Sequence, residues 1–111
     1  MKKKIYCFNN GGSSGWYEAV ALAEDGHFLA GHICSHEGYM AHDLGITSNW
    51  KHDNYNKHFG EGNWELEWID RDKLESHEGL NKAIALNATL TKEEHEKDAE
   101  AAPKVIIEVA Q

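Results

Sequence analysis

The segment 32–36 concentrates the side chains in this sequence that are best suited to chemistry. Strand side chains alternate between the two faces of a sheet, so His32, Cys34 and His36 would share one face if a strand continues through this segment. Imidazole and thiolate groups are natural Zn²⁺ ligands, and Cys7 on a neighbouring strand could supply the fourth. No Cys-x2-Cys or His-Glu-x2-His pattern supports the site. The alternative is that Cys34 is a small buried apolar residue and that the histidines lie at a strand end.

Two His-Asp dipeptides, His42-Asp43 and His52-Asp53, are further candidates for metal binding or for an acid–base pair. Adjacent helical residues point about 100° apart, so a dipeptide does not by itself form a site. These observations define one hypothesis for function. The histidine-rich segment 27–58 would make the chain a metal-binding protein or a small metal-dependent hydrolase, with zinc as the candidate cofactor.

Aromatic residues are numerous, with four tryptophans and four tyrosines in 111 residues. Trp64 and Trp68 alternate with glutamates and are predicted to lie in the core. Tyr39, Trp50 and Tyr55 lie among Asn, His and Lys residues, and aromatic side chains are enriched at protein interfaces and ligand pockets. We therefore predict these three residues as part of a binding surface.

The sequence contains no motif of nucleophilic catalysis. Ser13 and Ser14 lie in a glycine-rich segment, but this segment has neither a Gly-x-Ser-x-Gly elbow nor the Gly-Lys-Ser/Thr ending of a phosphate loop. No catalytic residue is predicted, and the glycine-rich segment is interpreted as a connection between strands.

The net charge of −8 is concentrated in the second half of the chain. Residues 61–111 hold thirteen acids and six lysines or arginines, whereas residues 1–60 hold six acids and five. Such a surface repels phosphate backbones, which disfavours nucleic-acid binding, and it could attract a basic protein. The acidic candidates for this contact are Glu93, Glu94, Glu96 and Asp98. The alternative is that the charge maintains solubility.

The expected location is the cytoplasm. The sequence has only two cysteines, no recognisable signal peptide and no apolar run near the roughly 18 residues that span a bilayer. We expect no membrane partner, and homo-oligomerisation is left open.

Apolar patterns predict strands at about 5–8, 16–23 and 27–35, and an Asp25-Gly26 turn between two apolar stretches is a strong hairpin signal. For 16–23 a helix is the alternative, because Ala19, Ala21 and Ala23 would also suit one. Residues 64–68 alternate strictly and predict a strand with its tryptophans toward the core and its glutamates toward solvent.

Helices are predicted at about 36–44, 49–59, 73–90 and 92–101, and a last strand at 104–109. Thr47 or Ser48 is the predicted cap of the second helix, and a break at Gly79 is the alternative for the third. The helix at 73–90 would begin with a capping box at Asp72–Glu75, and the next with one at Thr91–Glu94. A chain of this length and order is expected to be a single α+β domain over residues 1–111, with a small, largely antiparallel sheet, an early hairpin and several short helices.

Several motifs between His32 and Asp70 resemble small uncharacterised proteins encoded in tailed-phage genomes. They are Ser35-His36-Glu37-Gly38-Tyr39, His42-Asp43-Leu44-Gly45, Trp50-Lys51-His52 and Trp64-Glu65-Leu66-Glu67-Trp68. The resemblance covers about one third of the chain and carries over no functional residues. It implies a small accessory protein that binds and blocks a component of the host cell. The main hypothesis for function is therefore a non-enzymatic binding protein that inhibits a host protein, and the metal-binding protein or hydrolase is the alternative.

Overall fold

The computed structural model describes residues 2–9, 17–34, 40–96 and 98, and for residues 17, 32–34, 40, 95 and 96 it describes the backbone alone. In chain order the elements are β1 (Lys3–Asn9), β2 (Tyr17–Ala23), β3 (Phe28–Cys34), α1 (Met40–Asp43), α2 (His52–Phe59), β4 (Trp64–Ile69), the 3-10 helix η2 (Arg71–Lys73), α3 (Glu78–Thr89) and α4 (Lys92–Glu96). The predicted strand at 104–109 and the predicted helical residues beyond 96 lie outside the described residues.

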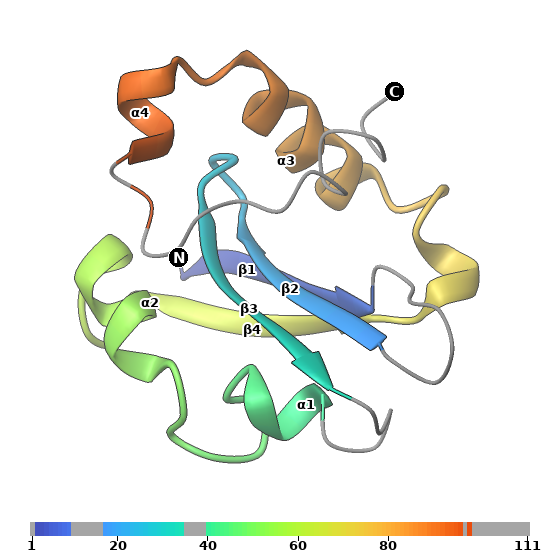
Figure 1. Ribbon diagram of the computed structural model, residues 1–111, viewed down its shortest axis with the longest axis vertical. Coiled ribbons are helices and arrows are strands. Elements are labelled where there is room, and N and C mark those ends of the chain that lie inside the picture. Colours follow the sequence, from blue (N-terminus) through green and yellow to red (C-terminus); the bar gives the residue numbers. More distant parts are fainter. Residues whose placement is uncertain (1, 10–16, 35–39, 97, 99–111) are drawn as a thin grey trace.

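The four strands form one sheet in the order β3-β2-β1-β4 (Figure 1). β1 and β2 are antiparallel, as are β2 and β3, whereas β4 runs parallel to β1. The α+β class with a compact sheet and short helices is therefore confirmed. The parallel pair was not predicted, and it arises because the chain crosses from the β3 edge through α1 and α2 to the far side of β1.

The hairpin between β2 and β3 turns at the Asp25-Gly26 pair, as the sequence predicts. The amide of Gly26 donates to the Ala23 carbonyl at 2.9 Å, and the φ angle of Gly26 is 97°, a conformation that glycine adopts without steric cost. The pairing shifts at Ala21/Leu22, so that Leu29 is an extra residue in β3.

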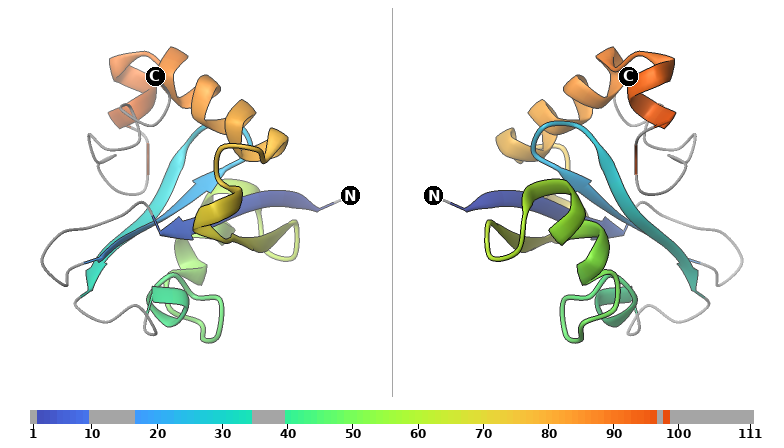
Figure 2. Two further views of the ribbon diagram at one scale, coloured as in Figure 1. Left: turned by 90° about the vertical axis from the view of Figure 1, so that its right-hand side faces the viewer. Right: turned by 90° about the vertical axis from the view of Figure 1, so that its left-hand side faces the viewer.

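Helices cover both faces of the sheet, with α3 on one side and α1 and α2 on the other (Figure 2). Alternate residues of each strand supply two separate apolar clusters. The cluster beneath α1 and α2 includes Ile5, Cys7, Ala19, Ala21, Ala23, Leu29, Ala30, Leu44 and Tyr55. The cluster beneath α3 comprises Tyr6, Phe8, Val20, Leu22, Phe28, Ile69, Leu80, Ala83 and Ile84.

The alternation predicted for β4 is confirmed on its apolar side. Trp64, Leu66 and Trp68 are half-buried and pack against the cluster beneath α1 and α2. On the opposite side Glu65 is exposed, but Glu67 is not a freely solvated glutamate as predicted, because its side chain is only 34 % exposed and contacts neighbouring charged groups.

The helix predicted over 73–90 is divided, and its predicted capping box at Asp72–Glu75 is wrong. The chain first forms η2 and then a turn, and α3 begins only at Glu78. His77 caps α3, because its Nδ1 accepts a hydrogen bond from the Leu80 amide at 3.0 Å. Imidazole is outside the usual group of N-cap side chains, so the sequence rule did not identify it.

Half of the capping box predicted for the last described helix is confirmed, since the Oγ1 of Thr91 accepts a hydrogen bond from the Glu94 amide at 3.1 Å. The second predicted helix begins three residues later than expected, at His52. The cap residue Lys51 makes no side-chain cap bond, and neither Thr47 nor Ser48, the predicted caps, occupies that position.

Replacement of Gly26 tests how closely the hairpin packs on α3. A Cβ at Gly26 would lie 2.7 Å from the Asn87 amide nitrogen, whereas a Cβ at Gly62, whose φ is also positive, would meet nothing within 4 Å. We expect Gly62→Ala to cost about 1 kcal/mol of unfolding free energy from the positive φ alone, and Gly26→Ala to cost at least about 2 kcal/mol more through the clash. Denaturant unfolding measures both variants, and equal costs would contradict close packing of the turn on α3.

Candidate functional site

The structure separates the three aromatic residues predicted for a binding surface. Tyr39 lies outside the described residues. Tyr55 is fully buried and its hydroxyl donates to the Leu44 carbonyl at 2.5 Å, so the prediction that Tyr55 belongs to an exposed surface is wrong. The α2 helix turns this ring inward, although its sequence neighbours are polar. Trp50 has 57 % of its surface exposed.

Trp50 lies in the connection between α1 and α2, residues 44–51, which we call the Trp50 loop. Two hydrogen bonds of Ser48 hold the loop near this residue: its hydroxyl donates to the His42 carbonyl at 3.1 Å and accepts from the Trp50 amide at 3.3 Å. At the end of the loop, the Nε2 of His52 lies 2.7 Å from the Gly45 carbonyl oxygen, to which it can donate. The exposed indole therefore projects from an internally bonded loop.

The loop backbone is also tightly folded. Lys51 is the one residue other than glycine with positive φ among the described residues, at 73°. Gly45 has φ of 81°, and a Cβ there would lie 2.0 Å from the Trp50 carbonyl oxygen. A non-glycine residue in this conformation costs on the order of 1–3 kcal/mol and persists only where the surroundings impose it, a feature found often at functional sites.

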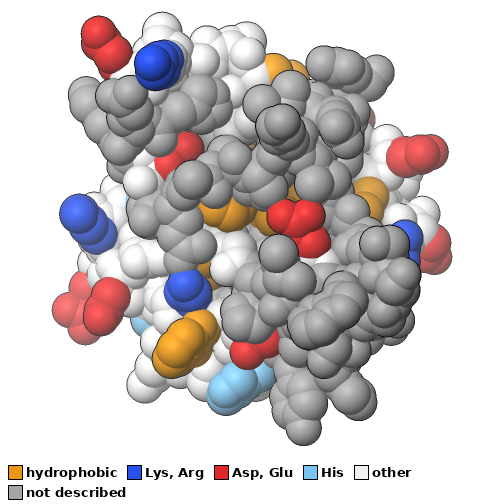
Figure 3. Space-filling model, in the orientation of Figure 1, with side chains coloured by type: hydrophobic (Ala, Val, Ile, Leu, Met, Phe, Trp, Pro, Cys, Tyr) orange, Lys and Arg blue, Asp and Glu red, His pale blue; other side chains and the backbone are white. Residues whose placement is uncertain are grey.

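The four acidic residues predicted to contact a partner do not behave alike. The Asp98 side chain has no exposed surface, and its Oδ1 lies 2.5 Å from His27 Nδ1, so the prediction that it presents charge to a partner is wrong. Glu93 is exposed and Glu94 is half-buried, and the side chain of Glu96 is not described. On the face drawn in Figure 3 the described acidic side chains lie apart from one another, with basic side chains among them.

Three histidine–carboxylate pairs connect distant parts of the chain, and sequence reasoning missed all three. They are His27–Asp98 at 2.5 Å, His58–Asp25 at 2.8 Å and His77–Glu67 at 2.6 Å. No local spacing rule predicts contacts between residues so far apart. Among the described residues, no hydroxyl or thiol is hydrogen-bonded to these imidazoles, as the nucleophile of a catalytic dyad would be.

The zinc prediction stays a prediction. The side chains of His32 and Cys34 are not described, and His36 lies outside the described residues. The described part of the chain contains no group of three or more His, Cys, Asp or Glu side chains that could hold a metal ion. The dipeptides at 42–43 and 52–53 accordingly form no such group.

The suggestion that Cys7 completes a zinc site is wrong. Cys7 pairs through Ala21 with Ala30, four residues before Cys34 on β3, which corresponds to about 13 Å along the strand. Burial also raises the pKa of the Cys7 thiol strongly, which disfavours the thiolate that a metal requires.

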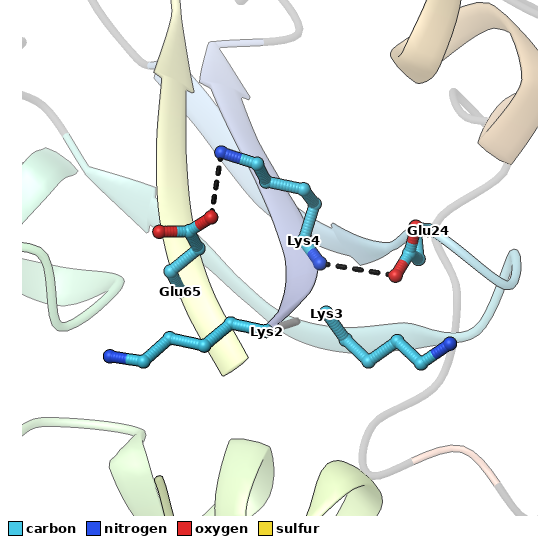
Figure 4. Close-up of a pocket in the computed structure, with 5 residues that line it drawn as sticks. All are labelled: Lys2, Lys3, Lys4, Glu24 and Glu65. Carbon is cyan, nitrogen blue, oxygen red and sulfur yellow. Dashed lines mark hydrogen bonds and ion pairs between the residues drawn. The ribbon is translucent and has the colours of Figure 1, made fainter. Parts of the chain in front are cut away.

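An open pocket of about 340 Å³ lies at the start of β1. Its lining residues are Lys2, Lys3, Lys4, Glu24 and Glu65 (Figure 4). The ammonium groups of Lys2 and Lys3 point in opposite directions, and Lys4 pairs with Glu65 at 2.9 Å. Because the cations diverge and carboxylates share the lining, the pocket does not form a convergent anion site.

Comparison with known protein families, with curated proteins and with solved structures finds no match for this chain. In the part of the chain that the structure describes, no helix is long and apolar enough to cross a membrane. The function must therefore be argued from the geometry of the Trp50 loop and of the surfaces around it.

The His58–Asp25 pair predicts a pH dependence of stability. Burial opposes ionisation of Asp25, but hydrogen bonds from the His58 ring and the His27 amide outweigh it and lower the pKa of the carboxyl group. A lowered carboxyl pKa contributes stability above the unfolded value of about 4, and this contribution is lost as the pH falls through the folded value. We expect Asp25→Asn to be less stable than wild type at pH 7. This difference in stability should shrink as the pH falls below about 4.

Thermal unfolding from neutral to acidic pH measures this difference. Asp53→Asn is the control, because Asp53 is an exposed acid of α2 and should change the unfolding midpoint little at any pH. A constant gap between Asp25→Asn and wild type over the whole range would contradict the proposed contribution.

Proposed function

We propose that this protein acts without catalysis, by binding another protein through the Trp50 loop. The observation that carries the proposal is the exposure of Trp50, a large apolar side chain, on a loop with internal hydrogen bonds. Tryptophan is enriched among the residues that dominate interface energetics, because its ring buries a large area in one contact.

The bracing of the loop supports this role. A partner that binds a mobile segment must offset the entropy lost when that segment becomes ordered. The contacts of Ser48 and the His52–Gly45 hydrogen bond already restrict the backbone on both sides of Trp50. Much of the ordering cost is then met during folding rather than during association.

The partner in this proposal is a protein of the host cell, in keeping with the resemblance to small phage-encoded proteins. A net charge of −8 favours approach to a basic surface and opposes approach to nucleic acid. Lys51 also contributes a cation beside Trp50, with its Nζ 6.0 Å from the ring centroid. The indole would therefore enter an apolar pocket that carries polar or acidic groups beside Lys51, within a partner surface that is otherwise basic.

Replacement of Trp50 tests the proposal, with Leu86→Ala as a matched control. Leu86 is also an exposed large apolar residue, 45 % exposed, but it lies on α3. Affinity capture from a bacterial lysate would identify the partner, and titration calorimetry would measure its binding. We expect Trp50→Ala to weaken binding by about 30-fold, as truncation of an interface hot spot does, and Leu86→Ala to leave it unchanged.

Thermal unfolding of both variants is the control that would show whether the fold is retained. A partner whose affinity is insensitive to Trp50→Ala would contradict the proposal. The same conclusion follows if Leu86→Ala, rather than Trp50→Ala, abolishes capture.

A further inference from the structure

The outer edge of the sheet at β4 offers a second, independent surface. β4 pairs with β1 and is the last strand on that side of the sheet, and no strand of the described residues pairs with its outer edge. The Lys3 amide donates to the Asn63 carbonyl at 2.8 Å, which fixes the direction of every backbone group that follows. Backbone groups alternate sides along a strand, so those of residues 63, 65, 67 and 69 face β1 and those of Trp64, Leu66 and Trp68 face outward.

These outward N–H and C=O groups have no partner within the described part of the chain. β4 has six residues, so the open edge is about 20 Å long. Unpaired edge groups are a template for another strand, and extended peptides bind proteins by adding to such edges.

The two faces beside this edge differ in chemistry. On one face lie the half-buried side chains of Trp64, Leu66 and Trp68. On the other face lie Glu65 and Glu67, which share one ammonium group, since Lys4 Nζ is 2.9 Å from the first carboxylate and 3.4 Å from the second. Glu67 also lies 2.6 Å from Nε2 of His77, whose Nδ1 accepts a hydrogen bond from the Leu80 amide. Among the described residues, Lys4 is the one lysine or arginine in an ion pair with Glu65 and Glu67, so negative charge remains beside the edge.

We infer that the β4 edge binds an extended segment of a partner protein in which apolar residues alternate with lysine or arginine. The backbone of that segment pairs with Trp64, Leu66 and Trp68. Its apolar side chains cover the half-buried side chains of these residues, and its basic side chains lie opposite Glu65 and Glu67. The inference goes beyond the Trp50 loop, because it depends on different residues and on backbone pairing.

Charge favours such a partner over a second copy of this chain. In a symmetric antiparallel pair of β4 strands, side chains on the same face lie opposite one another, so the glutamates of one copy would lie across from those of the other. Like charges directly opposite are destabilising, and charged residues on edge strands commonly prevent self-association. A basic strand meets the same carboxylates favourably.

Synthetic peptides test this inference with the full-length protein. One peptide alternates lysine and valine over about seven residues, the length of a typical strand, and its control replaces every lysine with glutamate. The measurement is NMR titration with amide hydrogen exchange. We expect the lysine peptide alone to bind and to slow exchange at Trp64, Leu66 and Trp68, while the amides at 65 and 67, already paired with β1, change little.

Variants separate edge pairing from general charge attraction. Glu65→Lys should weaken binding of the lysine peptide by about three- to tenfold, the effect of inverting one or two cross-strand charge pairs. Glu93→Lys makes the same change in net charge on α4 and should leave binding unchanged, as should Trp50→Ala. The result with Trp50→Ala keeps this test separate from that of the Trp50 loop.

Four results would overturn the inference. The first is no binding of the lysine peptide, and the second is equal effects of Glu65→Lys and Glu93→Lys. The third is slow amide exchange at Trp64, Leu66 and Trp68 in the protein without peptide, at a rate that does not change with protein concentration. This result would mean that another segment of the same chain covers the edge. The fourth is the same protection appearing with rising concentration, which would assign it to a second copy.

Discussion

The fold depends on the burial of β1 on both faces and its pairing along both edges. Every residue from Ile5 to Asn9 is buried. Ile5 and Cys7 point to the side of α1 and α2, and Tyr6 and Phe8 to the side of α3. A strand in this position requires a layer of helices on each face. It also requires a second neighbouring strand, on the side opposite β2, and β4 takes that place. The helix layers and the edge position of β4 both follow from this requirement.

The same architecture explains where the exposed surfaces arise. To reach the far side of β1, the chain passes through α1 and α2, and their short connection carries Trp50. His52 ties this crossover to the sheet, since its ring bonds the Gly45 carbonyl and lies 5.0 Å, edge to face, from the Trp64 ring. The Trp50 loop and β4 are thus supported by one histidine, although each offers a partner different chemistry.

Local sequence patterns predicted the structure correctly where it depends only on residues that are neighbours in the sequence. The Asp25-Gly26 turn and the apolar side of Trp64–Trp68 are examples, because turn geometry and strand alternation are properties of a few consecutive residues. Tyr55 and Asp98 were misplaced for the opposite reason. Their surroundings are set by Leu44 and His27, which lie in other segments of the chain, and the polar or charged character of sequence neighbours carries no information about such contacts.

The parallel pairing of β1 and β4 has a consequence for how the chain folds. It joins Lys3 to Trp64, whereas the antiparallel pairs join segments much closer in sequence. Closing the longer loop costs more entropy, so the hairpins can form while β1 still has one bare side. Lys2, Lys3 and Lys4 stand at the start of that bare strand. Positive charge at this point opposes pairing of nascent chains with one another before the sheet is complete.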